Sequence, residues 1–221
     1  MGEFSVGQPV TRTEDPRLLE GRGRYIGDFD LAGQAHAVIL RSPHAHALVH
    51  SIDASMARAA AGVIAVLTGE DYATDGLGNL PCDQTRFSPD GSPMYRPPRP
   101  ALVRNKVRLV GDYVALVIAE TLALAKDAAE LIEVDYEPLP SITSTADATN
   151  TSAPQIWEDC ENNVCFFHED GDKDAVDLAF ATADLVVSRR FVISRVTAAP
   201  MGPRGCIGDY DDALERYTIY T

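Results

Sequence analysis

The feature that most constrains the fold is an unbroken apolar run of strand length at residues 113–119, which reads YVALVIA. A strand that is apolar on both faces must be covered on both. Directly after it, Thr121 is placed to cap a helix over residues 122–131, and residues 132–136 alternate as a half-exposed strand. This succession of strand, helix and strand predicts an α+β domain around a buried sheet.

Further segments of strand and helix length precede this unit. Residues 35–40 form an apolar run, and residues 47–52 resume extended structure after Pro43 interrupts the strand, because proline lacks the backbone N–H that a ladder requires. Residues 53–61 predict a short helix, and residues 63–67 predict a buried strand. The first domain is therefore expected to contain several strands besides the one at its centre.

A long irregular stretch separates these segments from the central strand. Residues 69–100 are rich in Gly, Pro, Asp and Asn, and a loop of this length is usually functional or covered by a partner. We expect an intersubunit surface there. The neighbouring stretch 96–106 holds four basic residues, but prolines interrupt it, which favours a solvated loop over a nucleic-acid groove.

A linker and a second set of elements follow. Residues 143–153 are rich in Ser, Thr and Ala, which is typical of a linker, and residues 174–183 then predict a helix. A long strand is expected at 185–196, with shorter strands at 205–210 and 216–221. The last strand alternates as if to pair onward, so we expect the polypeptide or a partner chain to continue and the active site to be incomplete within this chain.

Charge and hydropathy exclude several classes of protein. The chain has 19 basic and 33 acidic residues and a net charge of -14, which would repel a phosphate backbone, so nucleic acid is not an expected partner. No stretch approaches the ~20 consecutive apolar residues of a membrane span, and the amino terminus lacks the pattern of a secretory signal. We expect a cytoplasmic protein without membrane contact.

The cysteines agree with a reducing compartment. Cys82, Cys160, Cys165 and Cys206 are sparse and irregularly spaced for a disulfide framework. Cys160 and Cys165 have the spacing that opens a plant-type ferredoxin cluster, but no third cysteine follows at the required distance. Reduced thiols are therefore favoured over an iron–sulfur site.

Two other motifs have structural as well as functional interpretations. Residues 21–27 resemble a dinucleotide-binding loop, but the third glycine comes one residue late and no strand precedes it, which favours a tight turn. On an extended segment His44, His46 and His50 would share a face and could bind zinc. Because Pro43 bends the segment, hydrogen bonds from these histidines to backbone carbonyls are favoured instead.

Five strings in order carry a resemblance to a known family. They begin with TEDPRLLEGRGRY at residues 13–25 and LRSPHAHA at 40–47, followed by VGDYVALVIAET at 110–121. VDYEPLP at 134–140 and MGPRG at 201–205 complete the set. Together they resemble the large subunit of the molybdenum hydroxylases, the xanthine dehydrogenase and aldehyde oxidase family with its carbon monoxide dehydrogenase-like branch.

The resemblance implies a domain organisation within the α+β class. Residues 1–22 would form an amino-terminal arm, residues 23–142 an α/β hammerhead domain, and residues 143–159 a linker. Residues 160–221 would begin a molybdopterin-binding domain, truncated here. The composition of the linker region agrees with these boundaries.

The resemblance also implies an activity of the assembly. Such enzymes oxidise an aldehyde, an N-heterocycle or carbon monoxide with oxygen from water, using molybdenum-molybdopterin, and pass electrons to iron–sulfur clusters and FAD on partner subunits or domains. The family's catalytic glutamate and its cofactor-binding glycine loops would lie beyond Thr221. No catalytic, cofactor-binding or metal-binding residue is therefore assigned here. The expected partners are the remainder of the large subunit, an iron–sulfur subunit and a FAD subunit in a hetero-oligomer.

One position departs from the family pattern. Gly202 stands where the last motif usually has glutamate. This leaves an alternative open, a non-catalytic hammerhead interaction module or a degenerate split subunit. In either case Arg41, His44 and Arg204 are the candidates for fixing a domain interface through hydrogen bonds to backbone or carboxylate groups.

Overall fold

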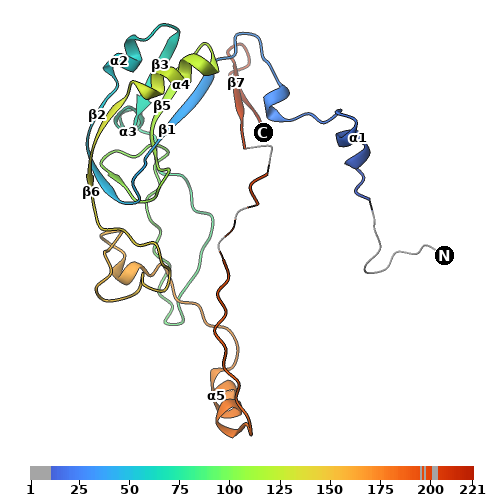
Figure 1. Ribbon diagram of the computed structural model, residues 1–221, viewed down its shortest axis with the longest axis vertical. Helices are drawn as coiled ribbons and strands as arrows, with labels where there is room; N and C mark the ends of the chain where they lie inside the picture. Colours follow the sequence, from blue (N-terminus) through green and yellow to red (C-terminus); the bar gives the residue numbers. More distant parts are fainter. Residues whose placement is uncertain (1–10, 195, 197, 201–203) are drawn as a thin grey trace, which may run out of the picture. The chain divides into compact units, whose positions relative to one another are not determined.

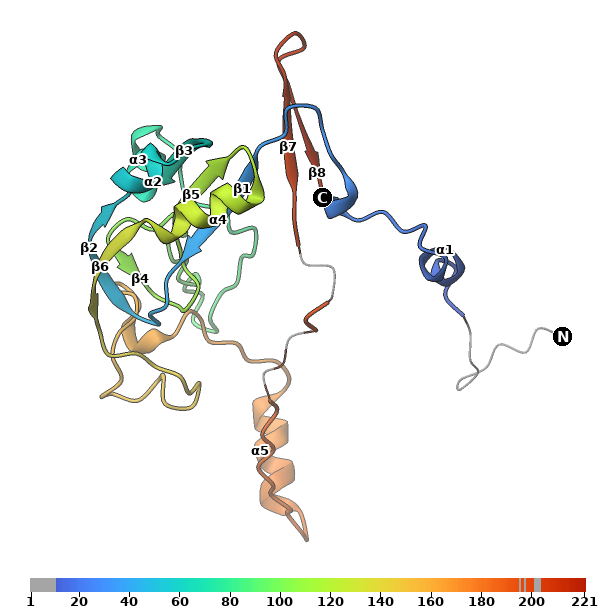
Figure 2. The same cartoon turned by 45° about the horizontal axis from the view of Figure 1, so that its top comes forward.

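The computed structural model describes residues 11–194, 196, 198–200 and 204–221. The chain divides into two compact units, one of residues 35–186 and one that joins residues 1–34 to 187–221. Figure 1 and Figure 2 show their elements from two directions. The larger unit contains two three-stranded sheets and most of the helices, which confirms the α+β class predicted from the sequence.

The first sheet is built around the strand that the sequence placed at the centre of the domain. Strand β5 (Tyr113–Ala119) pairs antiparallel with β1 (His36–Arg41) on one side and β3 (Val63–Thr68) on the other. Ala115, Val117 and Ala119 of β5 enter one core cluster, whereas Val114 enters a second. The strand is therefore apolar on both faces because it contributes to two cores.

Helix α4 (Leu122–Glu130) covers the first sheet on the face of β1 and β5 (Figure 1). The Thr121 hydroxyl accepts a hydrogen bond of 3.2 Å from the Leu124 N–H, as the sequence predicted for the helix start. The helix buries three alanines, whose small side chains allow it to lie close to the strands. The short helix α2 (Ser55–Ala59) completes this layer.

The second sheet has the order β4-β2-β6. Strand β2 (Ala47–Asp53) is central and pairs antiparallel with β4 (Lys106–Val107) and β6 (Glu133–Pro138), as Figure 2 shows. Its core cluster combines Ala47 and Val49 with Val107 and Val114. This cluster lies beside the site described below.

The prediction of an irregular loop over residues 69–100 was wrong at its beginning. Helix α3 (Gly69–Thr74) occupies the first six of these residues. The Asp71 carboxylate accepts hydrogen bonds from the backbone N–H and the hydroxyl of Thr68, both at 2.7 Å, and this capping arrangement starts the helix despite its glycine. The same bonds lower the pKa of Asp71, with Arg58 adding to the effect.

The larger unit also includes the segment beyond the linker. A single 3-10 turn, η2, spans Glu161–Asn163, and helix α5 spans Lys173–Thr182. The long strand expected at 185–196 was wrong, because none of its described residues is assigned to a strand. A strand needs a hydrogen-bonded neighbour, and none pairs with this segment within the described part of the chain.

The smaller unit joins the arm to a hairpin. The arm contains α1 (Asp15–Leu19) and the 3-10 turn η1 (Ile26–Asp28), and the hairpin pairs β7 (Ile207–Asp211) with β8 (Arg216–Tyr220). The rings of Phe29 and Tyr220 lie 6.2 Å apart, and a Cβ on Gly205 would come within 2.7 Å of Ile26. The two ends of the described chain thus contact each other in this unit.

Candidate functional site

The bend at residues 41–46 is held by backbone hydrogen bonds to the turn before β5. The Ser42 N–H donates to the Asp112 carbonyl and the Gly111 N–H donates to the Ser42 carbonyl, both at 2.8 Å. The His44 N–H donates to the Ser42 hydroxyl oxygen at 3.0 Å. Ser42 is buried, and these bonds satisfy its backbone N–H and carbonyl at the point where Pro43 interrupts the strand.

Two of the predicted interface residues flank this bend. The Arg41 guanidinium donates to the Gly111 carbonyl at 3.3 Å and lies 4.5 Å from the ring centre of Tyr113. The His44 ring lies 4.9 Å from that of Tyr136. Burial raises the pKa of the Tyr136 phenol, and a hydrogen bond with Ser42 opposes that shift.

The third predicted interface residue, Arg204, lies in the smaller unit and is exposed. Gly202, the departure from the family pattern, lies outside the described residues. Arg41 and His44 therefore lie together in the larger unit, whereas Arg204 belongs to the smaller one.

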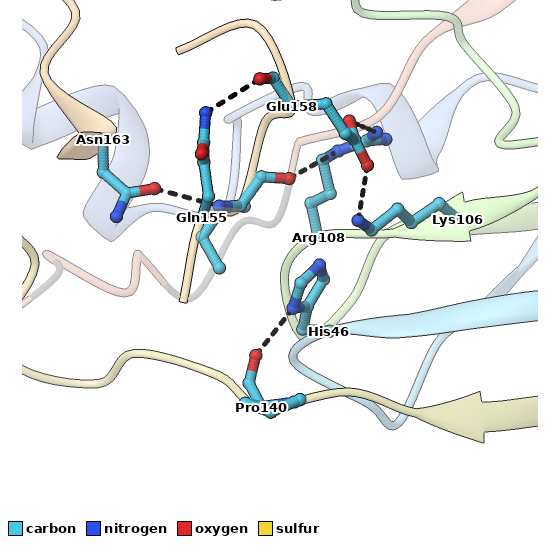
Figure 3. Close-up of polar contacts among 8 residues, drawn as sticks. His46, Lys106, Arg108, Pro140, Gln155, Glu158 and Asn163 are labelled. Atoms are coloured by element: carbon cyan, nitrogen blue, oxygen red, sulfur yellow. Dashed lines mark hydrogen bonds and ion pairs between the residues drawn. The ribbon is translucent and has the colours of Figure 1, made fainter. Parts of the chain in front are cut away.

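His46 makes the contact with a backbone carbonyl that the sequence favoured, whereas His50 contacts a side-chain carboxylate instead. His46 Nδ1 lies 2.7 Å from the Pro140 carbonyl oxygen, whereas His50 Nε2 lies 2.8 Å from a carboxylate oxygen of Glu137 (Figure 3 shows the first contact). His46 is buried, and its Nε2 has no hydrogen-bond partner among the described residues.

A polar cluster that the sequence analysis missed lies next to His46 in Figure 3. Lys106 Nζ donates to Glu158 at 2.6 Å, and the Arg108 guanidinium donates to the same carboxylate at 3.1 Å and to the Ile156 carbonyl at 3.0 Å. The hydrogen bond from Lys106 is the largest cause that lowers the pKa of Glu158 to about 2. The guanidinium of Arg108 also lies 3.9 Å from the ring centre of Trp157.

Further hydrogen bonds order the chain around this cluster. The Gln155 side-chain amide donates to the Glu158 carbonyl at 2.8 Å, and the Asn163 side-chain oxygen accepts from the Ile156 N–H at 2.9 Å (Figure 3). The contacts of Lys106 and Arg108 with residues 156 and 158 join segments about 50 positions apart in the sequence. Local sequence patterns do not predict contacts over such a separation. The one available signal was the concentration of basic side chains at 96–106, which favoured only a solvated loop.

The spacing of Cys160 and Cys165 has a structural explanation. The Cys165 thiol donates to the Tyr95 carbonyl at 2.8 Å, and the Cys160 thiol donates to the Val164 carbonyl at 3.3 Å. Burial raises the pKa of the Cys160 thiol, which favours its protonated form. None of the four cysteines forms a disulfide within the described part of the chain.

A groove of about 710 Å³ opens beside the cluster. Its walls come from α3 and the following residues to Leu80, from the stretch 95–113, and from residues 157–159, and Arg41 also lines it. We call it the basic groove, because five basic and three acidic side chains line it in a chain whose net charge is -14.

Within the described ranges, no group of three or more His, Cys, Asp or Glu side chains is arranged to hold a metal ion. The described residues therefore do not fit a metal centre, and no reaction step is assigned to them. None of the described helices is long and apolar enough to cross a membrane.

The sequence matches two family models in succession. Residues 20–140 match the aldehyde oxidase and xanthine dehydrogenase a/b hammerhead domain, and residues 156–221 match a molybdopterin cofactor-binding domain. The first match covers more than half of the chain and includes both sheets, Arg41 and His44.

Similar proteins extend over nearly the whole chain. It is 36% identical to the nicotine 6-hydroxylase large subunit of Paenarthrobacter nicotinovorans, over 97% of this chain and 25% of that protein. It is 33% identical to the carbon monoxide dehydrogenase large chain of Afipia carboxidovorans, over 97% of this chain and 27% of that protein. The chain thus spans about a quarter of the length of these relatives.

Solved structures agree with the sequence matches. The reconstituted CO dehydrogenase from Oligotropha carboxidovorans has a TM-score of 0.79 and 32% identity over 96% of this chain and 27% of its own. The quinoline 2-oxidoreductase from Pseudomonas putida 86 has a TM-score of 0.74 and 33% identity over 95% of this chain and 26% of its own. The chain therefore belongs to the aldehyde oxidase and xanthine dehydrogenase family, with that family's hammerhead domain followed by the start of a molybdopterin cofactor-binding domain.

Proposed function

We propose that this chain acts as the amino-terminal part of the large subunit of a molybdenum-dependent hydroxylase or dehydrogenase. The complete enzyme would oxidise an aldehyde, an N-heterocycle or carbon monoxide with oxygen from water. The observation that carries the proposal is the order of the two family matches, the hammerhead domain before the molybdopterin cofactor-binding domain. Two of the relatives are named for the hydroxylation of nicotine and the oxidation of carbon monoxide.

In this proposal the residues of the chain position other parts of the assembly. Molybdenum-molybdopterin would be bound mainly by residues outside the 221 present here, and iron–sulfur clusters and FAD by partner subunits. Arg41, His44 and Arg204 would contact the neighbouring domain. Arg41 and His44 are suited to this because both lie at a rigid bend and retain side-chain surface that is accessible to another domain.

We also infer a cytoplasmic location. The free cysteines support it, since thiols of this kind persist in a reducing compartment. Labelling the chain in the native host and fractionating the cells would test this inference, with a signal in the periplasmic or secreted fraction as the contradicting result.

The central experiment is metal analysis of the native complex. The chain would be affinity-tagged in its host and purified under non-denaturing conditions, with a mock purification from the untagged host as control. We expect molybdenum, iron and flavin to co-elute with the chain and with larger partners. Recovery as a molybdenum-free monomer would contradict the proposal and support the alternative, a non-catalytic interaction module.

A further inference from the structure

The basic groove has an unusual charge for this molecule. Of its three acidic side chains, Glu158 pairs with Lys106 and Arg108, and the Asp112 carboxylate accepts the N–H groups of Arg108 and Leu109 at 2.6 and 3.2 Å. The third, Asp159, makes no ion pair with any described residue. Arg99, on the exposed part of the groove, makes no ion pair within the described ranges. With Glu70, which pairs with Arg104, five basic side chains face four acidic ones, so the groove is weakly positive in a strongly acidic chain.

Part of the lining of this groove is apolar and exposed, and we call these side chains the rim. Leu77 and Leu80 on one segment are each 55% exposed, and Leu109 and Val110 on another are 51% and 65% exposed. Exposed large apolar side chains are common singly, but the four of this rim line one groove, and such a concentration is typical of an interaction site. Pro98 and Pro100 stiffen the wall between the two segments, which lowers the entropy cost of binding.

These features fit an extended peptide better than a small molecule. A small-molecule site encloses most of its ligand, whereas the rim side chains here remain about half exposed. An extended chain presents alternate side chains to opposite sides, so carboxylates and apolar groups can reach different walls of one groove. The Arg104 guanidinium pairs with the Glu70 carboxylate at 2.7 Å, so a carboxylate of the peptide would displace Glu70 or share the guanidinium with it.

We propose that the basic groove binds an extended acidic peptide segment of a partner protein. Carboxylates of that segment pair with Arg99 and Arg104, and its apolar side chains cover the rim formed by Leu77, Leu80, Leu109 and Val110. This goes beyond the proposed function, because it concerns the groove alone and requires neither molybdenum nor a particular substrate. It also specifies what would bind at the intersubunit surface expected at residues 69–100, namely an acidic segment with apolar side chains.

The chain contains its own reporter for the test. Trp157 is the only tryptophan of the sequence and it lines the groove, so its fluorescence reports on occupation directly. The probe is a short acetylated and amidated peptide of glutamate and leucine, titrated into the purified full chain at low salt. Matched peptides of lysine with leucine and of glutamate with glycine separate charge from apolar contact.

We expect the glutamate–leucine peptide to shift the Trp157 emission to shorter wavelength and to bind at least about tenfold more tightly than either matched peptide. The double variant Arg99→Glu, Arg104→Glu should weaken binding by at least about tenfold, whereas Lys126→Glu, an exposed charge on α4 away from the groove, should not. Rising salt should weaken binding to the unmodified chain.

Three results would overturn the proposal: an unchanged Trp157 spectrum, equal binding of the lysine–leucine peptide, or equal binding of the glutamate–glycine peptide. Unchanged affinity in the folded double variant would do the same. If that variant does not fold, Arg99→Gln with Arg104→Gln replaces it, and circular dichroism checks its fold. Metal content of the native complex is a separate readout, so failure here is distinguishable from failure of the proposed function.

Discussion

Helices α4 and α5 have the same type of N-terminal cap but differ in how much of their surface is buried. The side chains of Thr121 and Asp172 each accept a hydrogen bond from the third residue of their helix. Helix α4 buries Ala125, Ala128 and Ala129 against the first sheet, whereas none of the described residues of α5 is buried. The cap and the apolar pattern are enough to form a helix, but only the first helix gains stability from burial.

The strands show the same difference. Four residues of β5 are fully buried, and three of them, Ala115, Val117 and Ala119, are paired with both neighbouring strands. In residues 185–194 the large apolar side chains are 51% to 90% exposed. Both segments are rich in apolar residues, but β5 forms part of a core and residues 185–194 stay exposed. The reason is that only β5 has neighbouring strands within the described part of the chain.

The difference in burial between α4 and α5 is tested most strongly by placing a charge on each helix. Ala128 is 1% exposed, so Ala128→Asp buries an unpaired carboxylate and should lower the free energy of unfolding by at least about 3 kcal/mol. Ala179→Asp on the exposed α5 should change it by less than about 0.5 kcal/mol. Urea unfolding followed by circular dichroism measures both. Similar losses in the two variants would show that α5 is buried in solution.

A smaller loss of stability is expected from a substitution at Gly69, which lies close to the backbone of Val103. A Cβ at Gly69 would lie 2.2 Å from the Val103 carbonyl oxygen, so Gly69→Ala must displace α3 or the groove wall and should cost about 2 kcal/mol. The matched control is Gly27→Ala, where nothing lies within 4 Å. A stable Gly69→Ala protein with unchanged unfolding midpoint would argue against the position of α3.

The two ring nitrogens of the buried His46 differ in their hydrogen bonding. His46 Nδ1 has the Pro140 carbonyl as partner, and Nε2 has none among the described residues. His46→Asn keeps a donor near Nδ1, so it should be more stable than His46→Gln by about 1 kcal/mol. Thermal unfolding of the two variants tests this, and the reverse order would mean that Nε2 makes the more important contact.

The smallest effect concerns the ion pairs of Glu158. Its pKa is lowered from 4.5 to about 2, so its stabilising contribution is complete above pH 4.5 and is lost as the pH falls from there toward 2. Since the side chain is 62% exposed, we expect less than about 1 kcal/mol.

The measurement is amide exchange of the segment around η2 at several pH values. In Glu158→Gln the segment should exchange faster at neutral pH, and the loss of protection between pH 4.5 and 2 should become smaller. Glu130→Gln, at the exposed end of α4, is the matched control and should behave like the unmodified chain. A pH dependence that persists in Glu158→Gln would assign it to another group.

The sequence predicted those elements whose causes are local. The five strands of the two larger-unit sheets other than β4 follow from apolar runs, and α4 follows from its cap and pattern. Helix α3 was missed because the bonds between Thr68 and Asp71 are hidden in a stretch of loop-forming residues. The contacts of Glu158 could not be predicted, since they depend on which distant segments the fold brings together.

The site followed the same rule. The bend that carries Arg41 and His44 was visible because Pro43 interrupts a strand, but the basic groove was not, because its walls come from three separate stretches. The strand expected at 185–196 failed for the opposite reason: its pattern is strong, but a strand needs a partner.

Amide hydrogen exchange of the full 221-residue chain, read by mass spectrometry, tests the central difference most directly. The account predicts the slowest exchange in β1, β5 and α4, whose hydrogen bonds lie in or beside a buried core, and nearly unprotected amides in residues 185–194. Protection of residues 185–194 as strong as that of β5 would contradict it.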